Sequence, residues 1–294
     1  MKPLVSIGMP VYNGAKHLRE ALESLRAQTY RDFEIFISDN ASTDATPEIC
    51  AEYAKKDSRI RYVRQKENIG AIRNFGFVKR EACGTYFMWA AHDDRWDPKF
   101  IETCLGALEA DPSRVLAMSD FTRFDETNGE VERYGIQRAL PSAREPYPRL
   151  KQHILFYLQD GKGVPIYGLW RRGEIHDISL PDDWFYFPVR FIFEALFRGS
   201  AGLISKTLYF KRAALQKSKI PPSPASAGFG RAGKNQKSKI FGALQDRLRK
   251  LFGTLFRANI RAILESRKLN VSEKMKLIYW QVFVAGRLFF TRKT

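Results

Sequence analysis

Short apolar runs alternate with amphipathic stretches through the first third of the chain. The first run, Val5–Val11, is followed by a Tyr-Asn-Gly turn signal and then by residues 16–28, in which leucine and alanine recur at helical spacing. The order then repeats. Strands are expected over 5–11, 33–38, 60–64 and 85–91, and helices over 16–28, 47–56 and 68–82. This alternation predicts an α/β fold: a Rossmann-like, mostly parallel sheet with helices on both faces.

The end of each expected strand carries a residue able to contact a polar ligand. Pro10 closes the first strand, Asp39 the second and Asn68 the third, while Asp93 and Asp94 follow the fourth. In open α/β sheets, ligands bind in the crevice beyond the carboxyl ends of the strands. The pattern therefore predicts that these residues meet in one crevice.

The adjacent carboxylates of Asp93 and Asp94 indicate a cation site. Two like charges side by side raise each other's pKa unless a cation offsets them. Hard oxygen ligands suit Mg²⁺ or Mn²⁺, which usually complete their shell with substrate phosphates. A helix start is the alternative, since Asp97 can cap a helix that begins at Pro98, but it leaves the pair unexplained. No Gly-x-Gly-x-x-Gly follows the first strand, which argues against a dinucleotide site.

Four segments, in order and at similar spacing, resemble successive motifs of family 2 glycosyltransferases. They are residues 5–13, residues 38–44, Asn68-x-Gly70-x-x-Arg73-Asn74 and His92-Asp93-Asp94. The resemblance spans about residues 4–120. It implies a GT-A fold, a nucleotide-sugar donor with UDP as the first choice, a divalent metal, and inversion at the anomeric carbon.

The resemblance also implies roles on the nucleotide side of the site. Asp39 would accept a hydrogen bond from the nucleotide base, and the loop from Pro10 to Tyr12 would lie against that base. Asn13 and Asn68 belong to the same expected donor-binding set.

On the phosphate side, the resemblance implies that Asp93 touches the ribose or the sugar and that Asp94 ligates the metal. His92 stands where many relatives carry Asp, and it would either ligate the metal or orient its neighbours. Arg73 would add positive charge against the diphosphate, although an arginine on a helix also suits a solvated face.

Glycosyl transfer also needs a base to take a proton from the acceptor hydroxyl. Asp182-Asp183-Trp184 resembles the family's base element, with Asp183 as the first choice and Asp182 as the second. Pro188 would break a helix running straight from Trp184, so the next helix is expected to begin at about residue 191. An acidic surface turn is the alternative for the pair, and Glu194 is a lesser candidate for the base.

The composition of the chain changes at about Lys217. Residues 1–216 are expected to form the catalytic domain, 217–239 a flexible linker, and 240–294 a basic amphipathic helical tail. From Arg231 onward, 16 lysines and arginines stand against three acidic residues, and the whole chain carries +17. Such a tail is typical of binding to an anionic membrane surface. A hairpin packed on the catalytic domain or on a partner subunit is the alternative. Nucleic acid is disfavoured, because no recognition motif or stacking platform is present.

Other features of the sequence bear on location. No apolar run approaches the roughly 20 residues of a spanning helix, there is no secretory signal, and the three cysteines lack metal spacing. We expect a cytoplasmic enzyme, peripheral at the inner face of the membrane, that transfers sugar to a glycan or lipid-linked acceptor. The resemblance places it in bacterial cell-surface polysaccharide synthesis. A catalytically silent, donor-binding subunit of a glycan-assembly complex is the alternative.

Overall fold

The computed structural model describes residues 3–138, 140, 163–180, 187–213, 260, 263–264 and 270–279. The predictions for Asp182 and Asp183, for the linker 217–239 and for most of the tail lie outside these residues.

The described part of the chain forms one nine-stranded sheet in the order β3-β2-β1-β4-β8-β6-β9-β5, with β7 paired to β6. The strands are β1 (Val5–Val11), β2 (Phe33–Asp39), β3 (Ile60–Arg64), β4 (Tyr86–Trp89), β5 (Arg95–Trp96), β6 (Arg114–Phe124), β7 (Glu130–Tyr134), β8 (Leu169–Arg171) and β9 (Ser200–Arg212). The helices are α1 (Ala15–Arg26), α2 (Thr46–Lys56), α3 (Ala71–Glu81), α4 (Phe100–Glu109) and α6 (Phe187–Arg198), with short 3₁₀ turns η1 (Ile136–Arg138), η2 (Val164–Tyr167) and η3 (Arg172–Glu174).

The first half of the sheet has the parallel arrangement expected from the sequence. β1 lies between β2 and β4 and runs parallel to both, and β3 extends the sheet beyond β2. All seven residues of β1 are buried, which explains why an unbroken apolar run encodes it. Gly8 lies where a β-carbon would meet Val78 of α3 at 2.8 Å, so glycine lets the helix pack closely over the strand.

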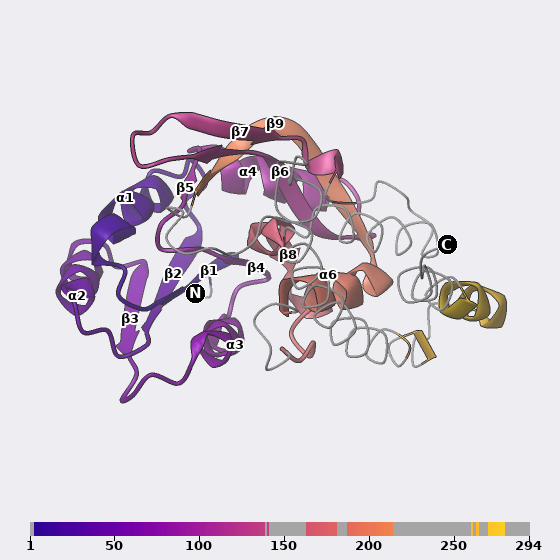
Figure 1. The fold of residues 1–294 in the computed structure, drawn as a ribbon, viewed down its shortest axis with the longest axis horizontal. Helices are drawn as coiled ribbons and strands as arrows, with labels where there is room; N and C mark the ends of the chain where they lie inside the picture. The colour runs from indigo at the N-terminus through magenta and orange to yellow at the C-terminus, as the bar shows by residue number, and fades with distance from the viewer. Residues whose placement is uncertain are drawn as a thin grey trace, which may run out of the picture.

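The second half of the sheet is mixed rather than parallel. β8 joins β4 to β6 through antiparallel pairs on both sides, whereas β6 and β9 run parallel to each other. β9 then reaches β5, which packs near α1. Figure 1 shows β7 and β9 arching back above β1 and β4 toward α1. The curled second half therefore brings the end of β9 over the carboxyl ends of the first strands.

An aromatic cluster holds the two halves together. The ring of Trp89 at the end of β4 contacts Phe75 of α3 and both Phe187 and Phe191 of α6, with centroid separations of 5.0 to 6.2 Å. α6 begins at Phe187, about four residues earlier than predicted, because Pro188 occupies the first turn of the helix. The missing proline N–H is not needed at that position.

Candidate functional site

The loops after β1 and β2 are tied together at the carboxyl edge of the sheet. The Asn13 amide N–H donates to Ser42 Oγ at 2.9 Å, and Asn13 Oδ1 accepts from the Thr43 amide N–H at 2.8 Å. Asn13 has a positive φ of 49°, a conformation that asparagine tolerates better than most residues. Tyr12 beside it is 45% exposed, so its ring is available to a ligand.

Asp39 lies at the end of β2, as predicted, and is fully buried. One carboxylate oxygen accepts from the Ser42 amide N–H at 2.9 Å. The other accepts from the Tyr62 hydroxyl at 3.2 Å and lies 3.6 Å from Arg64 Nε. These donors keep the carboxylate oriented at the edge of the sheet beside the loop that contains Asn13.

Asn68 and Asn74 fix the start of α3 against this edge. Asn68 Oδ1 accepts from Asn40 Nδ2 at 2.8 Å and from the Gly70 amide at 2.9 Å. Asn74 is buried and exchanges two hydrogen bonds with Ser38 of β2. Asn68 therefore stabilises the loop before α3. Asn74, for which no separate role was predicted, anchors α3 to β2. Arg73, one position earlier, is exposed in the first turn of the helix.

His92 and Asp93 follow β4, and both are half-buried. A β-carbon added to Gly14 would lie 2.6 Å from His92 Cδ2, so the imidazole packs directly over the β1–α1 loop. The end of β4 and the loop after β1 thus meet, as expected. This contact fits the orienting role that the sequence left open for His92.

Asp94, the next residue, is buried and bonded to the last strand. Its carboxylate is fully buried and accepts hydrogen bonds from the Tyr209 hydroxyl, from the Arg212 amide N–H at 2.8 Å and from Lys211 Nζ at 3.5 Å. All three donors come from the end of β9. Burial raises the pKa of Asp94, while Lys211 and the hydrogen bonds act in the opposite direction. Asp94 therefore anchors the last strand to the end of β4.

Arg212 extends this anchor to α1. Its guanidinium donates to Glu20 and, at 3.0 Å, to the carbonyl oxygen of Asp93. Neither Arg212 nor Glu20 was singled out from the sequence. Glu20 and Arg212 lie 192 positions apart in the sequence, so no local pattern could have linked them.

These contacts bear on the expected Mg²⁺ or Mn²⁺. The ligand role predicted for Asp94 stays a prediction, and both of its oxygens accept hydrogen bonds within the protein. Among the described residues, no group of three or more His, Cys, Asp or Glu side chains is placed to hold a metal ion. A cation held by one or two side chains together with substrate phosphates needs no such group. Asp93 and His92, half-buried at the crevice, are the side chains that fit this arrangement.

Lys79 of α3 fixes the chain that leads to the predicted base. Its buried ammonium donates to the carbonyl oxygens of Ile175 at 3.1 Å, His176 at 3.2 Å and Ile178. Burial lowers the pKa of Lys79 to about 8. Leu180 follows, packed against the core near Gly76. Asp182 and Asp183 themselves lie outside the described residues.

Glu194, the lesser candidate for the base, lies on α6 and forms an ion pair with Arg190 at 2.7 Å. This is an i, i+4 pair on the helix surface, a common stabilising arrangement. The contact gives Glu194 a structural partner.

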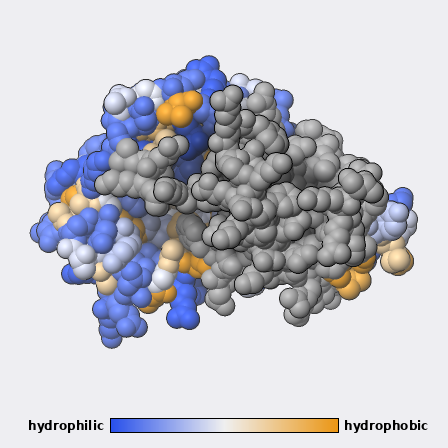
Figure 2. Space-filling view, viewed as in Figure 1, coloured by the Kyte–Doolittle hydropathy of each residue, from blue (hydrophilic) through white to orange (hydrophobic). Residues whose placement is uncertain are grey.

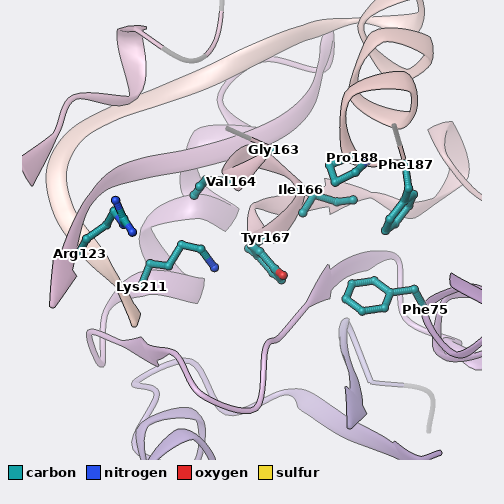
Figure 3. A pocket seen from close by; sticks show the side chains of 9 residues that line it. All are labelled: Phe75, Arg123, Gly163, Val164, Ile166, Tyr167, Phe187, Pro188 and Lys211. Atoms are coloured by element: carbon teal, nitrogen blue, oxygen red, sulfur yellow. The ribbon is translucent and has the colours of Figure 1, made fainter. Parts of the chain in front are cut away.

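A cavity of about 300 Å³ opens beyond β4, between the two halves of the structure. Figure 3 shows Arg123 and Lys211 at one end, Phe75 and Phe187 at the other, and Tyr167 between them. The remaining lining residues are Gly163, Val164, Ile166 and Pro188. Aromatic rings with a few charged groups at one end are typical of a pocket that binds a small polar ligand.

Comparison with known proteins agrees with this geometry. The family described as glycosyl transferase family 2 matches residues 6–171. EpsH of Bacillus subtilis is 30% identical over 224 residues, which cover 71% of this chain and 61% of EpsH. The glycosyltransferase GlyG of Streptococcus pneumoniae is 31% identical over 46% of this chain and 44% of GlyG. The chain thus spans less than two thirds of the length of these relatives.

Solved structures show the same fold. The structure of S. aureus TarS 1–349 superposes with a TM-score of 0.66 at 16% identity, covering 99% of this chain and 73% of that one. TarS 1–349 has also been solved in complex with UDP-GlcNAc. The mannosyltransferase PcManGT of Pyrobaculum calidifontis, in complex with GDP-Man and Mn²⁺, superposes with a TM-score of 0.51 at 15% identity. From the family match over more than half of its length, we conclude that the chain belongs to glycosyl transferase family 2.

Proposed function

We propose that this protein is an inverting glycosyltransferase that moves a sugar from a UDP-sugar to a glycan or lipid-linked acceptor, with Mg²⁺ or Mn²⁺ as cofactor. The observation that carries the proposal is the shared edge of the sheet. The buried Asp39, the tied loops around Asn13 and the half-buried Asp93 all lie at the carboxyl ends of adjacent parallel strands. The UDP-GlcNAc complex of the similarly folded TarS supports the choice of UDP.

In the proposed reaction, the nucleotide lies along the ends of β1 and β2, with Asp39 as hydrogen-bond acceptor for the base and Tyr12 against it. The cation, held by Asp93 and His92, would supply charge to stabilise the leaving diphosphate. Asp183 takes the proton from the acceptor hydroxyl as that oxygen attacks the anomeric carbon from the side opposite the diphosphate. The exposed Arg73 adds positive charge near the phosphates.

Nucleotide binding tests this proposal directly. UDP at about 100 times its Kd should stabilise the protein by about 2.7 kcal/mol, which raises Tm by roughly 4 to 5 °C for a chain of 294 residues. We expect this shift with UDP and Mn²⁺, and a smaller shift when EDTA removes the metal. GDP should give less than half of it. Asp39→Ala should reduce the difference between the Tm shifts produced by UDP and by GDP, because it removes the hydrogen-bond acceptor for the nucleotide base.

The control for this experiment is Asp125→Asn, a change in the exposed turn between β6 and β7. It should leave all the nucleotide shifts unchanged. No shift with any nucleoside diphosphate would contradict a donor site at this edge of the sheet. A shift with UDP but no release of UDP from UDP-sugars in the presence of acceptors would favour the silent-subunit alternative.

We also propose that the C-terminal region attaches the enzyme to an anionic membrane surface. The helix over residues 271–279 begins with a reciprocal cap, in which Asn270 and Glu273 exchange hydrogen bonds of 3.0 and 2.9 Å. Val271, Met275 and Tyr279 recur every four residues and are 77%, 61% and 72% exposed. Figure 2 shows apolar residues at the end of the molecule where Figure 1 places this helix.

The opposite side of this helix is packed, since Leu277 is fully buried. The buried Leu277 supports packing of one face, whereas the exposed row and the excess of basic residues after Arg231 support attachment to the membrane. None of the helices in the described part of the chain is long and apolar enough to cross a bilayer.

Vesicle co-sedimentation tests the attachment. The full chain should pellet with vesicles that contain anionic lipid and should be released partly by high salt, because salt screens the basic residues. Changing Val271, Met275 and Tyr279 together to serine should reduce the bound fraction at high salt several-fold, since it removes the apolar contact. Val131→Ser, at a valine 53% exposed on β7, is the matched control. Equal binding of the triple variant would contradict a role for this row.

A further inference from the structure

Arg123 and Lys211 are neighbours across the parallel strands β6 and β9, in direct register. Both side chains line the cavity described above (Figure 3). Like charges placed directly opposite on adjacent strands destabilise a sheet. Two cations that share one cavity wall therefore point to a function for that wall.

Within the described part of the chain, the partners of Arg123 and Lys211 do not use all of the hydrogen-bond donors of these two side chains. Lys211 Nζ lies 3.5 Å from Asp94, whose carboxylate it shares with Tyr209 and the amide of Arg212. Burial acts to lower the pKa of Lys211, but Asp94, Tyr167 and Asp93 together outweigh burial and raise that pKa. Arg123 Nη1 donates a hydrogen bond to Glu132 Oε2 at 3.3 Å. An ammonium has three donors and a guanidinium five, so both groups retain donors for a ligand.

Aromatic rings lie in the middle and at the far end of the cavity. Tyr167 lies beneath Lys211, whose Nζ is 5.0 Å from the centre of its ring, and Phe75 and Phe187 form the far end. A cavity of about 300 Å³ is at the lower limit of the size range of small-ligand sites. None of the described residues that line it is Asp or Glu.

The position of the cavity indicates which substrate it takes. The residues proposed for the nucleotide lie on β1, β2 and the end of β4, whereas the cavity is built by β6, β9, η2, α3 and the start of α6. Phe187 is also the first described residue after the segment that carries Asp183. Asp183, the proposed base, precedes Phe187 by four residues in the sequence, which supports assigning the cavity to the acceptor.

We infer that this cavity binds an acidic sugar of the acceptor, with Arg123 and Lys211 contacting its carboxylate or phosphate. The inference rests on the proposed function, because it assigns the acceptor class of the same reaction. The aromatic end holds the sugar ring, and the cation pair selects acidic over neutral acceptors.

Titration calorimetry on the full chain tests this inference. The probes are p-nitrophenyl β-glucuronide and glucose 6-phosphate, compared with the neutral p-nitrophenyl β-glucoside and glucose, each with and without saturating UDP and Mn²⁺. At least one acidic probe should bind about tenfold more tightly than its neutral counterpart, because charge-assisted hydrogen bonds are the stronger ones. The probe that shows the preference distinguishes a carboxylate from a phosphate site.

The variants are Arg123→Gln and Lys211→Met, each of which should reduce the preference to threefold or less while UDP binds as in the wild type. Arg133→Gln, at an exposed arginine on the neighbouring β7, should keep the full preference. The inference is overturned if the wild type shows no preference for acid. It is also overturned if the preference survives both changes, or if Arg123→Gln weakens UDP instead, which would assign the pair to the donor diphosphate. Failure of UDP to bind the wild type overturns the proposed function separately, because the titrations without UDP still measure the preference for acid.

Discussion

Asp94→Asn is expected to lower the free energy of unfolding by roughly 3 to 5 kcal/mol, as the loss of one partner from a buried ion pair does. The amide would leave Lys211 and the end of β9 without the carboxylate that now joins Tyr209, Lys211 and the Arg212 amide. Asp93→Asn should change stability by less than about 1 kcal/mol, because Asp93 is only half-buried. It should instead weaken UDP binding in the presence of Mn²⁺.

Urea unfolding of the two variants, followed by UDP titration with Mn²⁺ and with EDTA, separates the two roles. The neighbours differ by one position and carry the same chemical change, so each is the control of the other. If Asp94→Asn unfolds like the wild type and loses only its dependence on Mn²⁺, Asp94 is a metal ligand and the anchoring role is wrong.

The contrast between Asp93 and Asp94 also shows what a local sequence pattern cannot predict. The sequence identified the pair at the end of a strand because an abrupt change from apolar to charged residues is a local signal. Which of the two faces the crevice depends on Tyr209, Lys211 and Arg212, which lie more than 110 residues away. No local periodicity encodes that contact.

The first strands were predicted almost to the residue for a similar reason. β1 and β3 match their expected bounds, because each is a short stretch between turn signals or helices, apolar in β1 and alternating with arginine in β3. The antiparallel pairing of β8 with β4 and β6 was not predicted. β8 has only three residues, too few for an alternating pattern to be visible.

The start of α6 illustrates a different error. Pro188 was taken as a helix breaker, although proline is also favoured in the first turn of a helix. The structure places it there, directly after Phe187, whose ring packs on Trp89 and Phe75. Knowledge of that aromatic cluster, which joins three distant elements, was needed to choose between the two readings.

Asp183→Asn is expected to lower turnover on acceptor by about two orders of magnitude or more, as loss of a general base does, with the Kd for UDP unchanged. The described residues on either side of Asp183 are Leu180, which packs near α3, and Phe187, which lines the cavity. Asp182→Asn should be milder, and Glu194→Gln should have little effect, because Glu194 is paired with Arg190. Steady-state rates with an acidic acceptor, together with UDP titrations, provide the comparison. Near-normal turnover in both aspartate variants would remove the base from this segment, and a loss of UDP affinity equal to the loss of rate would place Asp183 at the donor instead.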